Sequence, residues 1–246
     1  MKKQISHIVA AILCLYLFNS CSKEKTFDCI KSTGHLKKED RYFDNFSSLY
    51  VYDNINVILV QNLAGKVTVE AGENLLPKIT CEQDGKKLTI KNKNTCNWVR
   101  KYDVPINLYV GVDQVKEISQ SGYGKINEGE PIKTDTLRIY NLTFGDTDLS
   151  IDATFVGFIA DDHSSFTLRG NVNKIAGKGF KNSKTDTKGA QAHWIYFINH
   201  SLLDAEIFSD SLVQADMAGD GNILCSGHPP FVQYHYFSGK GTLQFP

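Results

Sequence analysis

The chain has 246 residues, of which 41% are hydrophobic and 22% are charged. This composition excludes a disordered or collagen-like chain, and the length suits one domain or one long repeat array. The 27 basic residues equal the 27 acidic residues, so no excess of positive charge indicates binding to nucleic acid. The 19 glycines and 6 prolines favour many strands and tight turns over a helical bundle.

Residues 1–20 are typical of an export signal, with two lysines followed by an apolar run from Ile8 to Phe18. That run is too short to span a bilayer, which takes about 20 apolar residues. It leads into Leu17-Phe18-Asn19-Ser20-Cys21, which resembles the lipobox of bacterial lipoproteins. The resemblance implies cleavage before Cys21 and acylation of that cysteine. We therefore expect a lipid anchor in the bacterial cell envelope, at the outer membrane; an ordinary secreted protein is the alternative.

Residues 21–40 are polar and lack periodicity, so they predict a tether between the lipid and a folded domain of residues 41–246. A disulfide between Cys29 and Cys96 is the pairing that we favour in an oxidising compartment, because both cysteines lie in polar, irregular segments. Free thiols or a Cys81–Cys96 bridge are the alternatives. No C-x-x-C or Cys–His spacing occurs, so we expect neither a metal site nor a cofactor.

The first half of the domain alternates apolar and other residues in several short segments, with Ala64-Gly65 and Asp84-Gly85 as turns. This period of two predicts strands with one buried face. The expected strands lie at 55–59, 66–70, 87–91 and 105–110. These irregular first strands are expected to cover one end of the domain.

From Val115 onward, similar segments recur at nearly constant spacing. Successive copies are offset by 19, 19, 20, 18 and 19 residues, and they begin at Leu137, Val156, Ile175, Ile195, Val213 and Val232. A unit of this length cannot bury its apolar face alone, but units stacked at about 4.8 Å form a continuous core. The repeat predicts an all-β fold, a β-solenoid with rungs of about 19 residues. An antiparallel sandwich is the structural alternative.

Two features of individual copies lead to further expectations. In the copy that begins at Ile175, Thr185 and Thr187 occupy the second apolar pair, which predicts the least stable rung. The last rung leaves an open sheet edge. We expect this edge to be covered by another subunit, giving a homo-oligomer through the solenoid end, or to be blunted by Lys240 and Pro246.

Several segments together resemble a known family. They are the alternating strands from Phe46 to Val110, the Gly72–Ile79 and Cys96–Arg100 segments, and the Ser-Gly-x-Gly turns. The family is the putative auto-transporter adhesin, head GIN domain family of bacterial cell-envelope proteins. The resemblance implies a single right-handed β-helix-like domain that binds rather than catalyses. The family brings no established catalytic residues.

The outward positions of the repeats predict a binding face. Alternation places Tyr140, Tyr196 and His235 outward, with Trp194 just ahead, so an aromatic ledge for sugar rings or a protein partner is expected. Lys178 and Lys181 belong to a lysine cluster that suits an anionic glycan or a neighbouring protein. The alternative interpretation is an ordinary surface of aromatic residues and solvated charges.

Catalysis is the competing hypothesis. Asp161-Asp162-His163-Ser164 contains the residue types of acid–base and nucleophilic catalysis, and β-helices carry polysaccharide lyases and hydrolases. The segment falls at a turn of the repeat, however, where Asp and Ser are favoured because they bond nearby backbone amides. We therefore predict a non-catalytic, lipid-anchored protein that binds or scaffolds a glycan or a surface protein; a carbohydrate-active enzyme is the alternative.

Overall fold

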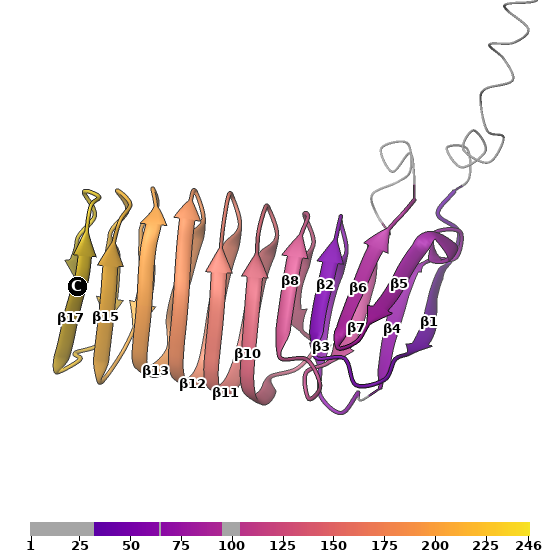
Figure 1. The fold of residues 1–246 in the computed structure, drawn as a ribbon, viewed down its shortest axis with the longest axis horizontal. Helices are drawn as coiled ribbons and strands as arrows, with labels where there is room; N and C mark the ends of the chain where they lie inside the picture. The colour runs from indigo at the N-terminus through magenta and orange to yellow at the C-terminus, as the bar shows by residue number, and fades with distance from the viewer. Residues whose placement is uncertain (1–31, 64, 95–103) are drawn as a thin grey trace, which may run out of the picture.

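The computed structural model describes residues 32–63, 65–94 and 104–246. In this part of the chain it contains an 18-stranded sheet, one 3-10 helix and no α-helix. The strands stack side by side along one long axis, with the C-terminal strand at one end and the first strands at the other (Figure 1). None of the described residues belongs to a helix of the length and apolarity that crossing a membrane takes.

The later part of the chain forms a β-solenoid in which each rung contributes one strand to each of two faces. The strands of the first sheet, here called the front face, are β8 (Glu117–Ser121), β10 (Ile132–Asn141), the second halves of β11 (Asp146–Ala160), β12 (Ser165–Lys181) and β13 (Lys184–Ser201), then β15 (Leu212–Met217) and β17 (Phe231–Phe237). The back face contains β9 (Lys125–Glu128), the first halves of β11 to β13, β14 (Ala205–Phe208), β16 (Ile223–Ser226) and β18 (Leu243–Gln244). All these neighbours pair in parallel.

The register confirms every spacing expected from the sequence. Leu137 lies opposite Val156, and Val156 lies opposite Ile175. The series continues through Ile195, Val213 and Val232. The antiparallel sandwich is therefore wrong for this part of the chain. The one-residue expansion to 20 has a local cause, because the pairing of β12 with β13 shifts between Thr167 and Arg169.

Inward side chains of successive rungs form one continuous core. Phe158 and Phe166 are buried and their rings stack at 3.9 Å between centroids, with 6° between the ring planes. The ring of Phe197, two rungs further along, lies 6.0 Å from that of Phe158 between centroids. Thr185 and Thr187 take inward positions, with exposed fractions of 3% and 0%. Two hydroxyls therefore occupy the core of that rung, whereas the inward pairs of its neighbours are Phe166 with Leu168 and Ala205 with Ile207.

The N-terminal strands do not follow chain order. They are β1 (Leu36–Tyr42), β2 (Ser48–Tyr52), β3 (Asn56–Val60), β4 (Lys66–Gly72), β5 (Ile79–Asp84), β6 (Lys87–Asn92) and β7 (Asn107–Gly111), with the 3-10 helix η1 (Leu76–Lys78) before β5. Strand β2 lies between β6 and β8, and β3 lies between β7 and β9, all in parallel. The first rung in the chain is thus enclosed by two later ones.

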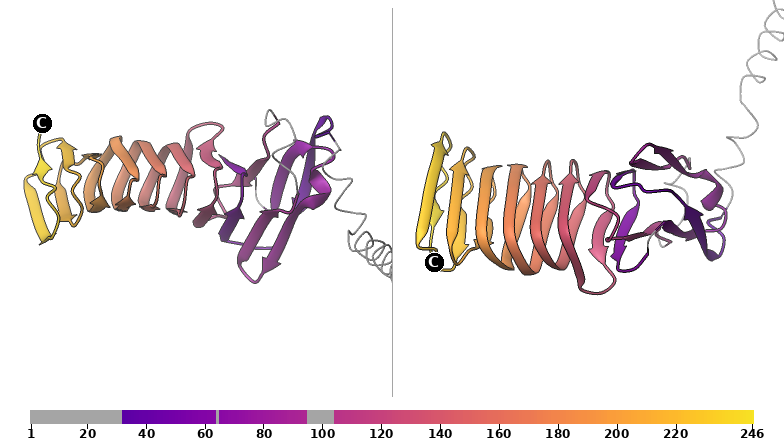
Figure 2. Two further views of the ribbon diagram at one scale, coloured as in Figure 1. Left: turned by 90° about the horizontal axis from the view of Figure 1, so that it is seen from above. Right: turned by 60° about the horizontal axis from the view of Figure 1, so that its bottom comes forward.

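Antiparallel strands close this end of the solenoid, where the indigo and magenta segments form a broader unit (Figure 2). Strand β1 pairs with β4 along all of its residues, β4 pairs with β7, and β5 pairs with β6. Because β1 begins at Leu36, residues 36–40 belong to the sheet although the sequence analysis assigns them to the tether. They escape a hydropathy pattern because most of β1 is exposed.

Candidate binding surface

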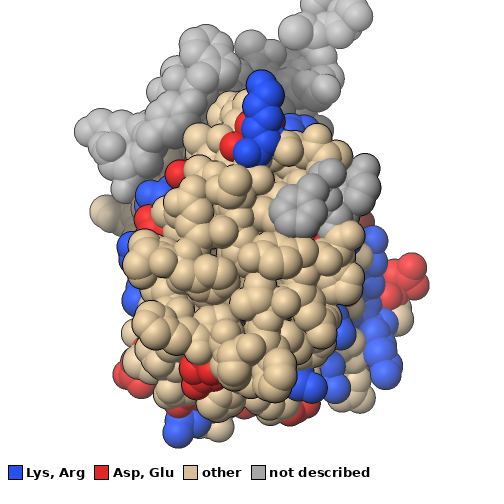
Figure 3. Space-filling view, turned by 90° about the vertical axis from the view of Figure 1, so that its left-hand side faces the viewer, with Lys and Arg blue, Asp and Glu red and all other residues tan. Residues whose placement is uncertain are grey.

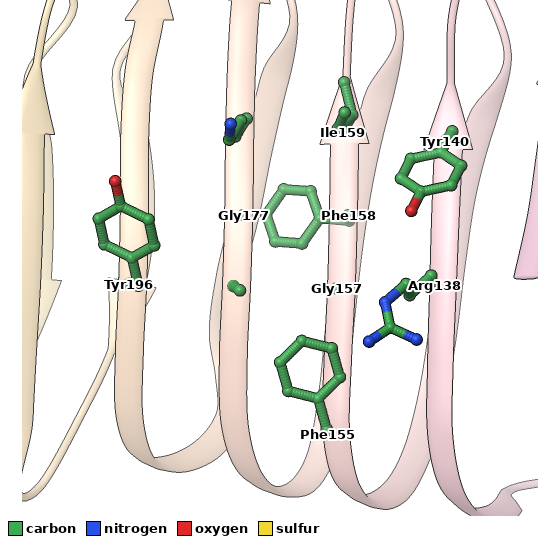
Figure 4. A pocket seen from close by; sticks show the side chains of 10 residues that line it. Arg138, Tyr140, Phe155, Gly157, Phe158, Ile159, Gly177 and Tyr196 are labelled. Carbon is green, nitrogen blue, oxygen red and sulfur yellow. The ribbon is translucent and has the colours of Figure 1, made fainter. Parts of the chain in front are cut away.

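The front face contains a shallow apolar dish between β10 and β13 (Figure 4). Register places Gly157, then Ala176, between Arg138 on one side and Tyr196 on the other. Since glycine and alanine have little or no side chain, two rungs of this outward row form a floor. The depression measures about 250 Å³, and its lining consists of Arg138, Tyr140, Phe155, Gly157, Phe158, Ile159, Ala176, Gly177, Lys178 and Tyr196.

The walls of the dish are held by contacts between neighbouring rungs. The Arg138 guanidinium lies over the Phe155 ring, 5.2 Å from its centroid. The Tyr196 hydroxyl donates a hydrogen bond to Asp216 Oδ2 at 3.0 Å, and burial, reinforced by this carboxylate, raises the pKa of Tyr196 above its usual value. The phenol therefore remains neutral, with its ring toward the dish.

Two cationic side chains border this apolar surface. Arg138 and Lys178 both line the dish, and neither forms an ion pair with a described residue. A cation that has no carboxylate partner is available to an anionic ligand, and a guanidinium can bind a carboxylate through two parallel hydrogen bonds. The arrangement combines apolar rings with positive charge around one depression.

The structure brings together most, but not all, of the predicted binding residues. Tyr140, Tyr196 and Lys178 line the dish. The His235 ring lies 6.2 Å from the ring of Tyr196, edge to face. Trp194 lies in the neighbouring row, where its indole N–H donates to Gln214 Oε1 at 3.0 Å. The Lys174 ammonium lies 5.1 Å from the centroid of that indole ring.

Two expectations for the surface need changes. Lys181 is the last residue of β12, where its ammonium pairs with Asp161 at 3.1 Å, away from the lining of the dish. The aromatic residues do not form a continuous ledge, because Gly157 and Ala176 lie between Arg138 and Tyr196 in one row. In the next row Tyr140 is followed by Ile159 and Lys178. The surface is a dish with aromatic walls.

Phe155, Gly157 and Ala176 are the residues that the sequence reasoning missed. A signal for them existed, because the same offsets that align the core align these outward positions with Arg138 and Tyr196. A search for large aromatic and charged side chains does not find Gly157 and Ala176, which form the floor of the dish.

The predicted cysteine sites divide between described and undescribed residues. Cys21, Cys29 and Cys96 lie outside the described residues, so lipid attachment and the Cys29–Cys96 bridge remain predictions. Cys81 and Cys225 are free thiols. Burial raises the pKa of Cys225 to about 11, which keeps the thiol protonated and unreactive at neutral pH.

The Asp161–Ser164 segment serves its own turn. The backbone N–H of Asp162 donates to Asp161 Oδ1 at 2.6 Å, and Ser164 is buried. The His163 ring stacks on Phe144 at 5.5 Å, and Phe144 stacks on Tyr123 at 4.9 Å. Within residues 32–63, 65–94 and 104–246, no group of three or more His, Cys, Asp or Glu side chains is placed to hold a metal ion.

Comparison with solved structures shows the same fold. A crystal structure described as a putative adhesin from Bacteroides fragilis NCTC 9343 has a TM-score of 0.76 and 16% identity, over 87% of this chain and 99% of that one. A crystal structure described as a putative lipid binding protein from Parabacteroides distasonis ATCC 8503 has a TM-score of 0.63 and 14% identity, over 88% of this chain and 100% of that one. A crystal structure described as a putative adhesin from the same strain has a TM-score of 0.59 and 19% identity, over 87% of this chain and 98% of that one.

The search of curated proteins finds no match. The family model described as putative auto-transporter adhesin, head GIN domain, matches residues 45–229, which include most of the N-terminal strands and all rungs before the last. The chain therefore belongs to the family of putative auto-transporter adhesins with a head GIN domain.

Proposed function

We propose that this protein is a non-catalytic adhesin of the cell envelope whose front-face dish binds an acidic sugar unit of a surface glycan. The observation that carries the proposal is the combination of Tyr140, Phe155 and Tyr196 with two cations, Arg138 and Lys178, around a floor of small residues. Membership of an adhesin-like family agrees with a binding role.

The chemistry of the dish suits a uronic or sialic acid better than a neutral sugar. Sugar rings present apolar C–H faces that pack on aromatic rings, and the floor of Gly157 and Ala176 leaves space for one ring. Arg138 and Lys178 would then meet the carboxylate of the sugar. A shallow, open site gives modest affinity, which repeated units of a polymer would increase through multivalency.

Glycan binding is tested with the full chain in mild detergent on an array of acidic glycans and their neutral counterparts. We expect binding that favours the acidic members. Ala176→Phe should remove binding to all members, because the phenyl group would fill the floor of the dish. Ser150→Phe, which adds the same bulk to the back face, is the matched control and should bind like the native chain.

The role of charge is tested separately. Arg138→Gln combined with Lys178→Gln should lower the preference for acidic glycans by about tenfold or more, equivalent to about 1.4 kcal/mol. Binding to the neutral counterparts should change little. If the Ala176→Phe variant binds glycans as well as the native chain does, the dish is not the site. Selective binding of lipid vesicles instead of glycans would also overturn the proposal.

We also propose that acylation at Cys21 anchors the protein in the outer membrane. The support is the resemblance of the segment before Cys21 to a lipobox. Two or more acyl chains bury many methylene groups at about 0.8 kcal/mol each, so attachment would be permanent. Cys21→Ser should move the protein from the membrane fraction to the soluble fraction. Protease treatment of intact cells then distinguishes surface display from a periplasmic location.

A further inference from the structure

The C-terminal end of the solenoid exposes the edge of a sheet. Strand β17 pairs with β15 on one side, and no described strand pairs with its other side. An unpaired edge is a template for another strand. On the back face the edge strand β18 has only two residues, so it offers little to pair with. The edge that remains open is that of β17, whose pairing with β15 shifts by one residue at His235.

The end face beside this edge is largely uncharged. Figure 3 shows it formed mostly by uncharged residues, with charged side chains mainly at its margins. Val232 and Tyr234 continue the inward rows of Val213 and Ala215, yet Tyr234 is 50% exposed. Phe231 and Phe245 are 64% and 44% exposed. Tyr234 therefore lies half open to solvent at a position that is core in every earlier rung, whereas Phe231 continues an outward row.

The opposite end is protected in ways that this end is not. The edge strand β1 carries the sequence Lys-Lys-Glu-Asp-Arg from residue 37 to 41. If two such strands paired antiparallel about their centre, Lys37 would face Arg41 and Glu39 would face the Glu39 of the other strand, so that these like charges repel while only Lys38 and Asp40 attract. Arg41 also donates hydrogen bonds to the carbonyl oxygens of Ile79 at 2.5 Å and Leu76 at 3.1 Å, which occupies groups near β5.

From these differences we propose that a second copy of this chain docks on the C-terminal end, with β17 pairing antiparallel to β17 of the other copy about Tyr234. Strand β17 reads Phe-Val-Gln-Tyr-His-Tyr-Phe and contains no Lys, Arg, Asp or Glu, so self-pairing meets no like charges. The two-fold arrangement closes on itself, because the protected N-terminal ends lie at the far ends of the pair. The dimer does not extend into a fibre.

The arrangement also fixes the orientation of the two copies. The two-fold axis of an antiparallel strand pair is perpendicular to its sheet, so both front faces lie on the same side of the dimer. A target that carries repeated binding groups would meet two identical surfaces at once.

The test is the mass of the full chain in mild detergent, measured by sedimentation velocity over a hundredfold range of concentration. Pairing about Tyr234 places Gln233 opposite the partner's His235. Gln233→Lys with His235→Lys therefore sets like charges face to face, whereas Gln233→Lys with His235→Glu sets opposite charges face to face. Asn173→Lys with Gln191→Lys, at exposed positions of middle rungs, is the matched control.

We expect the native chain, the control and the opposite-charge variant to be dimers. The like-charge variant should dimerise at least tenfold more weakly with an unchanged melting temperature. A native chain that stays monomeric overturns the proposal, and so does a like-charge variant that dimerises as well as the native chain. Native dimers that persist while both double variants of β17 are monomers would place the contact elsewhere than the predicted pairing and would also overturn it.

Discussion

The Phe158 ring lies over the backbone of Gly177 in the next rung, so that a Cβ atom on Gly177 would overlap the ring. The ring cannot move away easily, because it is buried and stacked on Phe166. Gly177 thus gives space to an aromatic group that fills the core beneath the dish. The Phe158 side chain therefore fills core space in its own rung and in the rung of Gly177.

We expect Gly177→Ala to destabilise the protein by about 1–3 kcal/mol, the usual cost of overpacking a well-packed core. Urea unfolding would measure the change. Gly129→Ala is the matched control, because the nearest atoms to an added Cβ there lie 3.8 Å away, in ordinary contact. Lost glycine flexibility in the unfolded chain favours folding at both positions, since neither glycine has a positive φ. Equal effects at the two positions would therefore contradict a cost set by the Phe158 ring.

Inward register is tested by Phe197→Asp. Phe197 is fully buried, so the substitution removes a large apolar group and places a carboxylate where no partner can reach it. We expect a loss of more than about 4 kcal/mol, enough to unfold most domains of this size. Ile198→Asp, on the outward side of the same strand, should cost far less. Similar melting temperatures for the two variants would contradict the register.

The sequence predicts the solenoid well because apolar side chains repeat with the length of one rung. Apolar residues at Val156, Ile175 and Ile195 recur with the rung length, and parallel pairing of consecutive rungs converts that recurrence directly into register. The same repeat offsets align Gly157 and Ala176 with Arg138 and Tyr196 to form the dish. The expected position of each strand in the later rungs therefore required no knowledge of distant contacts.

The remaining features escape a pattern search for physical reasons. The β2–β3 rung lies between rungs formed much later in the chain, and hydropathy carries no record of which strand is its neighbour. Buried polar residues also mislead it: Asn141 and Asn199 are both fully buried, and Asn141 donates to Thr147 Oγ1 at 2.7 Å at a corner of its rung. Their hydrogen bonds exist only in the folded coil.

The two inward threonines lead to a prediction of increased stability. The hydroxyl oxygens of Thr185 and Thr187 are buried and have no hydrogen-bond partner among the described residues. Because an unsatisfied buried hydroxyl costs about 1–3 kcal/mol, Thr185→Val with Thr187→Val should stabilise the protein by a comparable amount. Thr147→Val is the control and should destabilise it, since Thr147 accepts the hydrogen bond from Asn141. Equal signs for both changes in urea unfolding would refute this argument.

A pH dependence follows from Glu70, which fastens the antiparallel strands of the N-terminal end. Its carboxylate accepts hydrogen bonds from Asn107 Nδ2 and from the Tyr109 hydroxyl, both at 2.9 Å, and pairs with Lys38 at 3.4 Å. These contacts, the bond from Asn107 first, hold the pKa of Glu70 below its usual value of 4.5.

A carboxyl whose pKa is lowered by folding stabilises the protein above its unfolded pKa, and this stabilisation is lost as the pH falls through the lower, folded value. Glu70→Gln should therefore lower the free energy of unfolding at pH 7 by about 1–3 kcal/mol, because hydrogen bonds to the charged group are lost. The difference from the native chain should shrink steadily below about pH 4.5. Thermal unfolding between pH 7 and pH 3 measures it, with Glu130→Gln, at an exposed position, as control. A difference that is constant with pH would mean that Glu70 acts through shape and not through its charge.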